Sequence, residues 1–138
     1  MNNMKICPKV LIVEDDKLIA KAMSIQFKSA NFKVKIAKNG DEALDILNKW
    51  VPSAVIRDIL MPEKDGFEVL TEIKKTEKLK GMPVLIASNL NQEKDVLKGI
   101  KLSAAEFFVK SNMDLQEIVR KTLYYIKMSD HGRKSLEV

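Results

Sequence analysis

The sequence has one cysteine, one histidine and no long hydrophobic run, and each shortage excludes a class of protein. Cys7 has no second cysteine with which to form an internal disulfide, so we expect a reducing, cytoplasmic environment. Because the only histidine, His131, lies in a polar C-terminal stretch, no thiolate or imidazole metal site is expected. No apolar segment approaches the roughly 20 residues of a membrane span, and the N-terminus lacks the apolar core of a signal peptide.

The rest of the composition is that of an ordinary soluble protein. The 138 residues are 46% hydrophobic and 31% charged, which suits a single domain with its own core. We expect one domain over residues 1–138, with a folded core from about 9 to 128 and a tail or linker stump over 129–138. The net charge of +5 raises the question of nucleic acid. Because the lysines are spread along the chain with few aromatics between them, we expect a solvated surface or an acidic protein partner instead.

Hydrophobic patterning predicts five strands that alternate with five helices. The expected strands cover residues 9–14, 33–37, 54–58, 83–87 and 106–109. The expected helices cover residues 17–30, 40–50, 68–75, 92–102 and 114–128. The first helix carries an apolar row at Leu18, Ala22 and Ile25, with Ile19 and Met23 beside it. Asn31 is expected to stop this helix, and Asn39 is expected to cap the second. This alternation predicts an α/β fold, with a parallel sheet covered by helices on both faces.

Polar residues stand at the carboxyl ends of four expected strands. Glu14 and Asp15 end the first, Asp58 the third, Ser88 the fourth and Lys110 the fifth. Because the carboxyl ends of parallel strands share one edge of a sheet, we expect these residues to converge there. Clustered carboxylates favour a hard divalent cation such as Mg²⁺, and a lysine and a hydroxyl can bind an anion. Such a set suits a carboxylate that attacks a phosphoryl group and then holds it.

Four motifs together resemble the response-regulator receiver domain of two-component signalling, a flavodoxin-like family that includes the chemotaxis regulator. They are Leu-Ile-Val-Glu-Asp-Asp (11–16), Asp-Ile-Leu-Met-Pro-Glu-Lys-Asp-Gly (58–66), Leu-Ile-Ala-Ser (85–88) and Ala-Glu-Phe-Phe-Val-Lys (105–110). The resemblance covers about residues 9–128 and implies a doubly wound (βα)5 fold whose five-stranded parallel sheet has the order 2-1-3-4-5. An Asp after a strand ordinarily caps a turn or a helix. The resemblance makes this role the weaker alternative for Asp58.

The resemblance implies that Asp58 is the phosphoacceptor. Glu14 and Asp15 would be the acidic pair that holds Mg²⁺, together with Asp58 and the backbone carbonyl of Leu60. Arg57, directly before the acceptor, departs from the apolar residues usual there. Strand alternation points Arg57 away from Asp58, so its side chain must either reach solvent or find an acid.

The remaining family positions belong to the switch. The resemblance implies that Ser88 is the switch hydroxyl and that Lys110 pairs with the phosphoryl group. Phe107 takes the place of the switch aromatic, although a plain core role is equally open. Ser111 stands where the family usually has a proline, which leaves the isomer of the Lys110–Ser111 peptide bond open, and Asn89 replaces a small residue.

By this resemblance the chain is a phosphorylation-controlled switch and not an enzyme, apart from self-phosphorylation and self-dephosphorylation. A sensor histidine kinase or a phosphotransfer protein would donate the phosphoryl group. An output protein or domain would read the surface of the fourth helix, fifth strand and fifth helix, around residues 94–120, with no membrane or direct nucleic-acid contact. Two alternatives stay open: a pseudo-receiver or adaptor module without phosphorylation, and a haloacid-dehalogenase-type phosphatase. The phosphatase family has a second Asp where this chain has Leu60, which disfavours that alternative.

Overall fold

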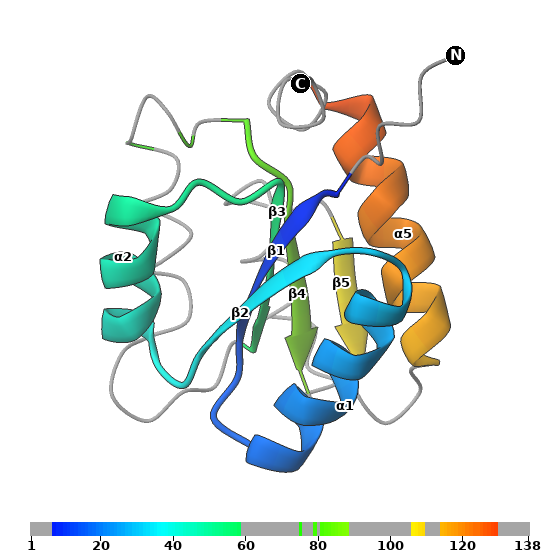
Figure 1. Ribbon diagram of the computed structural model, residues 1–138, viewed down its shortest axis with the longest axis horizontal. Coiled ribbons are helices and arrows are strands. Elements are labelled where there is room, and N and C mark those ends of the chain that lie inside the picture. Colours follow the sequence, from blue (N-terminus) through cyan, green and yellow to red (C-terminus); the bar gives the residue numbers. More distant parts are fainter. Residues whose placement is uncertain are drawn as a thin grey trace.

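The computed structural model describes residues 7–58, 75, 79, 81–88, 106–109 and 114–129, and for 58, 86–88 and 106–109 it describes the backbone alone. The strands are β1 (Lys9–Val13), β2 (Lys33–Ala37), β3 (Ala54–Asp58), β4 (Val84–Ser88) and β5 (Glu106–Val109). They form one parallel sheet in the order β2-β1-β3-β4-β5 (Figure 1). The predicted α/β fold, five-stranded sheet and strand order are therefore confirmed.

Helices cover both faces of this sheet. The described helices are α1 (Lys17–Ser29), α2 (Gly40–Lys49) and α5 (Leu115–Met128). Figure 1 shows α2 on one side of the sheet and α1 with α5 on the other. The expected helices over 68–75 and 92–102 lie outside the described residues, apart from Lys75, which is helical. In the part of the chain that is described, no helix has the length and apolar character that crossing a membrane requires.

Two apolar clusters hold the helices against the sheet. On the α2 side the cluster includes Leu11, Val13, Ala43, Leu47 and Val55. On the side of α1 and α5 it includes Val10, Ile12, Met23, Phe27, Ile56, Ile118 and Ile126. Because successive residues of β1 and β3 alternate between the clusters, both strands are buried on both faces. The continuous apolar runs of these two strands are explained by this double burial.

Helix α1 ends as the sequence predicts. Asn31 adopts a left-handed conformation with φ of 68°, directly after the C-cap residue Ala30. The Phe32 N–H donates to the Phe27 carbonyl at 3.0 Å, which is the six-residue hydrogen bond of a Schellman motif. The rings of Phe27 and Phe32 then meet edge to face, with 4.9 Å between their centroids. Local backbone chemistry and core packing therefore stop the helix at the same point.

The face that α1 buries differs from its most apolar row. Ala20, Met23, Ser24 and Phe27 are buried, whereas Leu18 is 80% and Ile25 is 54% exposed. The row of Leu18, Ala22 and Ile25 therefore lies toward solvent. The residues expected beside that row face the core instead, since Met23 belongs to the apolar cluster and Ile19 packs against it.

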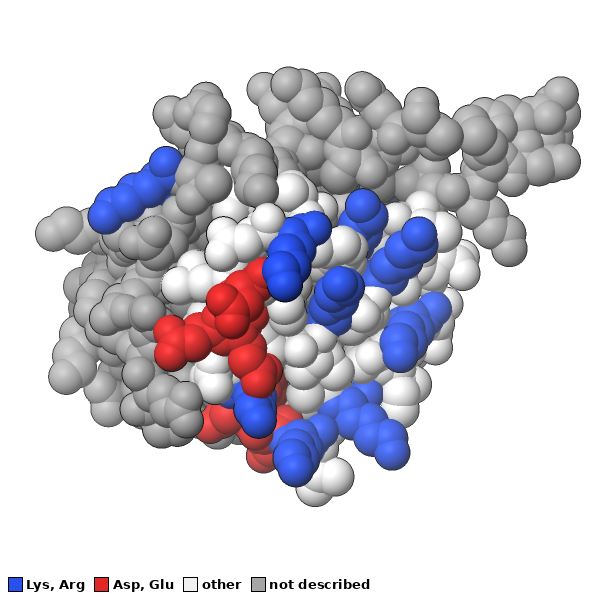
Figure 2. Space-filling model, turned by 60° about the vertical axis from the view of Figure 1, so that its left-hand side comes forward, with Lys and Arg blue, Asp and Glu red and all other residues white. Residues whose placement is uncertain are grey.

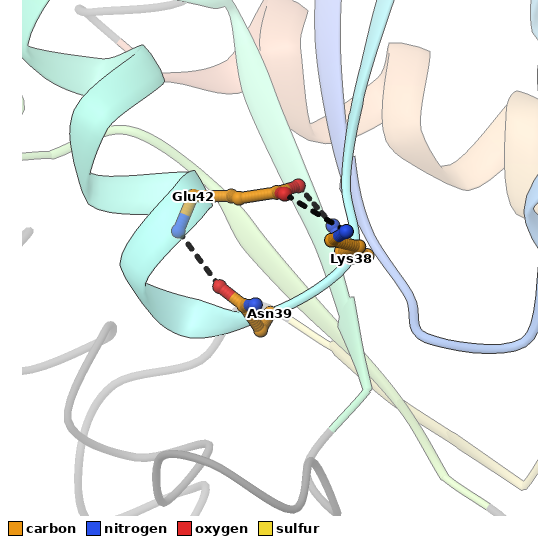
Figure 3. Close-up of polar contacts among 3 residues, drawn as sticks. All are labelled: Lys38, Asn39 and Glu42. Atoms are coloured by element: carbon orange, nitrogen blue, oxygen red, sulfur yellow. Dashed lines mark hydrogen bonds and ion pairs between the residues drawn. The ribbon is translucent and has the colours of Figure 1, made fainter.

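The helices begin at side-chain caps. Asn39 Oδ1 accepts a hydrogen bond of 2.8 Å from the Glu42 N–H, which confirms Asn39 as the cap of α2 (Figure 3). The carboxylate of Glu42 turns back and accepts from the Lys38 N–H at 2.9 Å. In α5 the cap is Asp114, whose Oδ1 accepts from the Gln116 N–H at 3.0 Å, so the helix begins one residue later than predicted.

Candidate functional site

The first acid of the candidate site, Glu14, directly follows β1. Its N–H donates to the Ala37 carbonyl at 2.9 Å, which continues the pairing of β1 with β2 by one residue. Its side chain is only 2% exposed, and its Oε2 accepts from the Asp16 N–H at 3.2 Å. The carboxylate is therefore held inside the turn between β1 and α1, at the carboxyl edge of the sheet.

The next two acids have different tasks. Asp16 is exposed and caps α1, because its Oδ1 accepts from the N–H groups of Leu18 and Ile19 at 2.9 and 3.1 Å. Asp15 is also exposed, between the buried Glu14 and the cap. Sequence reasoning did not assign the capping role of Asp16, although an Asp directly before a helical pattern is the usual signal. Asp16 therefore has a structural role in this turn, and the ligand roles of Glu14 and Asp15 stay predictions.

The sheet register brings the other strand ends to the same edge. Asp58 is the last residue of β3 and pairs with Ala87, and Ser88 is the last residue of β4 and pairs with Val109. Because Arg57 pairs with Val13, Asp58 stands beside Glu14 when the ladder is continued by one residue. Neighbouring strands lie about 5 Å apart, so the backbones of Glu14, Asp58 and Ser88 follow one another along this edge.

Part of the predicted site lies outside what the structure describes. Leu60 and Lys110 are outside the described residues, although Lys110 directly follows Val109 at the end of β5. Ser88, Asp58 and Phe107 are placed by their backbones alone, and Phe107 pairs with Ile86 in the middle of β5. The Lys110–Ser111 bond and Asn89 also lie outside the described residues. The structure therefore brings together the strand positions of the predicted site, and the side-chain roles stay predictions.

Arg57 is buried at the centre of the sheet. Its side chain is 1% exposed, so of the two expected possibilities the one in which it reaches solvent is wrong. Val55 lies in the cluster on the α2 side and Ile56 in the other, so alternation places Arg57 on the α2 side. A buried guanidinium requires hydrogen-bonding partners, and Arg57 does interact with other groups. The residue before the predicted acceptor is thus a cation inside the core.

The donors described at the edge suit a hard cation, although they are not a complete site. Glu14 and Asp15 supply carboxylate oxygens, the ligands that Mg²⁺ prefers. Among the residues whose side chains are described, no group of three Asp, Glu, His or Cys residues could hold a metal ion. The third predicted carboxylate, that of Asp58, is not among those side chains. Of the predicted metal ligands, the described side chains therefore include two, Glu14 and Asp15.

Known proteins resemble this chain in both sequence and fold. A family profile described as "Response regulator receiver domain" matches residues 10–122. The "Probable transcriptional regulator ycf29" of Porphyra purpurea is 34% identical over 118 residues, which are 84% of this chain and 56% of the relative. The "Transcriptional regulatory protein AfsQ1" of Streptomyces coelicolor is 30% identical over 103 residues, 75% of this chain and 44% of the relative. The chain thus spans about half the length of the curated relatives it matches.

Solved structures give the same result. The Mn²⁺-bound form of response regulator Rcp1 superimposes with a TM-score of 0.74 at 29% identity, covering 83% of this chain and 90% of that one. The receiver domain of Francisella response regulator 1452 gives a TM-score of 0.79 at 27% identity, covering 88% of this chain and 98% of that one. With the profile match and the strand-end arrangement, these similarities show that the chain belongs to the response regulator receiver domain family of two-component systems.

Proposed function

We propose that Asp58 accepts a phosphoryl group from a phosphohistidine and that the modified domain signals to an output partner. The observation that carries the proposal is the register that places Glu14, Asp58 and Ser88 in a row at the carboxyl edge of the sheet. A sensor histidine kinase or a phosphotransfer protein is the donor that fits a receiver domain. The chain itself is a switch and not an enzyme, apart from its own phosphorylation and dephosphorylation.

In the proposed transfer, a carboxylate oxygen of Asp58 attacks the phosphorus of the phosphohistidine. The new bond joins that oxygen to phosphorus, the phosphorus–nitrogen bond breaks, and the imidazole leaves with the bonding electron pair and is then protonated. The Ser88 hydroxyl donates to a phosphoryl oxygen, and the Lys110 ammonium offsets its negative charge. Asp58 thereby holds the phosphoryl group until water releases it.

A divalent cation would complete this site. Glu14, Asp15 and Asp58 would hold Mg²⁺ with their carboxylates, and Leu60 would add its backbone carbonyl. When bound, the ion neutralises charge on the transferring phosphoryl group. The burial of Glu14 and its hydrogen bond from the Asp16 N–H support this role, since the carboxylate is oriented before any ion arrives. The Mn²⁺-bound form of Rcp1 supports a divalent ion in this family.

The output step follows from the added charge. The phosphoryl group draws Ser88 toward it, and Phe107 moves into the space that this shift opens. The surface formed by the fourth helix, β5 and α5, around residues 94–120, then repacks and presents a new face to an output protein or domain. The transcriptional regulators among the relatives support an output of that kind. A phosphohistidine donor and the free, exposed Cys7 support a cytoplasmic location.

Phosphorylation by a small donor tests the proposal. Incubation with acetyl phosphate and Mg²⁺ should add one phosphoryl group to the intact mass, and Asp58→Asn should abolish the addition. Asp45→Asn is the matched control, because Asp45 is an exposed acid on α2 and should not affect labelling. An unlabelled native protein would indicate a pseudo-receiver, and labelling that survives Asp58→Asn would place the acceptor elsewhere.

A further inference from the structure

The lysines are spread along the chain, but one segment of it contains no acid. From Lys17 to Lys38 there are six lysines and no aspartate or glutamate. The acids Glu14, Asp15 and Asp16 stand directly before this segment, and Asp41 and Glu42 follow it within four residues. The segment is α1 with β2, and all six lysines are exposed. Much of the net charge of +5 is therefore concentrated on two adjacent elements.

These lysines belong to one edge of the molecule, since α1 and β2 pack against each other and β2 ends the sheet. We name it the α1–β2 face, and its lysines are Lys17, Lys21, Lys28, Lys33, Lys35 and Lys38. Figure 2 shows one side of the molecule on which cations spread over one part of the surface beside a streak of acids. Lys38 pairs with Glu42 at 3.7 Å, and Lys35 lies over the Trp50 ring at 5.1 Å.

The other lysines of this face are available to a partner. Within the described part of the chain, Lys17, Lys21, Lys28 and Lys33 form no ion pair. An acidic surface would therefore not first have to break an ion pair between these lysines and the described residues. Interactions of this kind raise association rates and depend strongly on salt.

Apolar side chains are exposed among these lysines. Leu18 and Ile25 of α1 are 80% and 54% exposed, and Ile36 of β2 is 42% exposed. Large apolar side chains surrounded by charged ones are the usual composition of a protein-binding surface, in which the apolar groups supply buried area and the charges supply orientation. A solvated face alone would not require three exposed aliphatic side chains in one acid-free segment.

We propose that the α1–β2 face binds an acidic surface of a partner protein, independently of phosphorylation at Asp58. The face is bounded, with Glu14, Asp15 and Asp16 at one end and the acids of α2 beyond Lys38. A nucleic acid or an anionic membrane would extend over these acids and be repelled by them. The two aromatic side chains of the segment, Phe27 and Phe32, are buried and unavailable for base stacking. A protein can match a patch of limited size.

The proposal is tested with an acidic probe of the right length. Hexaglutamate, extended, reaches about 20 Å, close to the length of the 13-residue helix α1. Titrated into the ¹⁵N-labelled chain at low salt, it should shift backbone amide signals of residues 17–38 and leave those of α5 unchanged. No shifts, or shifts spread equally over all exposed lysines, would overturn the proposal.

Charge-reversal variants separate this face from net charge. Lys28→Glu with Lys33→Glu should raise the dissociation constant of hexaglutamate at least about fivefold. Lys49→Glu with Lys127→Glu should raise it less than about twofold, although both pairs change the net charge equally. Lys28, Lys49 and Lys127 all lie in the last turn of a helix, so the effect of reversal on the helix itself is similar. Equal losses in the two variants would show that net charge alone matters.

The class of partner is tested with probes of similar charge. Hexathymidylate should bind the native chain more weakly than hexaglutamate, and vesicles that contain phosphatidylserine should not sediment it at physiological salt. Equal or tighter binding of the oligonucleotide through residues 17–38 would assign the face to nucleic acid and overturn the proposal. Sedimentation with vesicles that Lys28→Glu with Lys33→Glu abolishes would assign it to a membrane surface and overturn it as well.

Discussion

Strands β1 and β2 are neighbours of equal length, and every residue of one pairs with a residue of the other, yet their environments are opposite. Residues 10–13 of β1 are 0% exposed, whereas Lys33, Lys35 and Ile36 of β2 face solvent. The reason is position, because β1 has a strand on each side and β2 ends the sheet. Lysines on an edge strand also hinder pairing with another chain. Two paired strands of the same length can therefore differ strongly in burial, with β1 in the core and most of β2 on the surface.

Charged residues show the same contrast. Glu14, which directly follows the inner strand β1, and Arg57 of the inner strand β3 are 2% and 1% exposed, whereas Lys33 of the edge strand β2 is exposed. Burial of a charge without a partner costs several kcal/mol, so charges at the centre must be compensated by other groups or used in chemistry. Charges on the edge strand contribute little to folding stability and act mainly on the association of the protein with charged partners.

The largest effect is expected from a pair of isoleucines. Ile12 of β1 and Ile36 of β2 are direct partners across the two strands and are 0% and 42% exposed. Ile12→Ala should lower the free energy of unfolding by about 4 kcal/mol, because it leaves a cavity in the core. Ile36→Ala should lower it by only about 1 kcal/mol, because the side chain is partly hydrated already. Urea unfolding of both variants measures the difference, and similar losses would contradict the contrast between centre and edge.

A somewhat smaller loss of stability is expected when the buried cation Arg57 is replaced and compared with the exposed cation Lys33. Arg57→Met should lower the free energy of unfolding by about 3 kcal/mol, because the side chain is 1% exposed and its interactions with other groups in the core are lost. Lys33→Met removes the same charge at the edge and should change stability by less than about 0.5 kcal/mol. The same urea experiment compares them. A stable Arg57→Met variant would show that the buried guanidinium contributes nothing to folding.

Much of the fold is predictable from the sequence because the pattern of each element is local. The apolar runs of β1 and β3, the helix stop at Asn31 and the cap at Asn39 were sufficient to place these elements to within a residue or two. The buried face of α1 was only partly predictable. Two apolar rows overlap on that helix, and Met23 and Phe27 are buried whereas Leu18 is exposed. Periodicity identifies both rows but does not say which of them meets the sheet.

The sequence predicted where the candidate site lies in the fold better than it predicted the role of each residue in it. Alternation of strands and helices is sufficient to bring Glu14, Asp58 and Ser88 to one edge, because parallel strands end there together. The choice of Asp58 as acceptor and of Asp15 as ligand depended on the family resemblance, since periodicity does not distinguish one acid from another. The capping role of Asp16 required the hydrogen bonds that the structure shows.

The turn after β2 extends the comparison to local hydrogen bonds, where the smallest effects are expected (Figure 3). Asn39→Ala should lower the free energy of unfolding by about 1 kcal/mol, because the Glu42 N–H loses its acceptor at the start of α2. Glu42→Gln keeps an oxygen that can accept from the Lys38 N–H, but it removes the exposed ion pair and a negative charge in the first turn of α2, so it should cost about 0.5 kcal/mol. Urea unfolding at low and high salt separates them, since only the contribution of the Glu42 charge is screened. A Glu42→Gln loss as large as that of Asn39→Ala would mean that charge, and not capping, holds this edge of the molecule together.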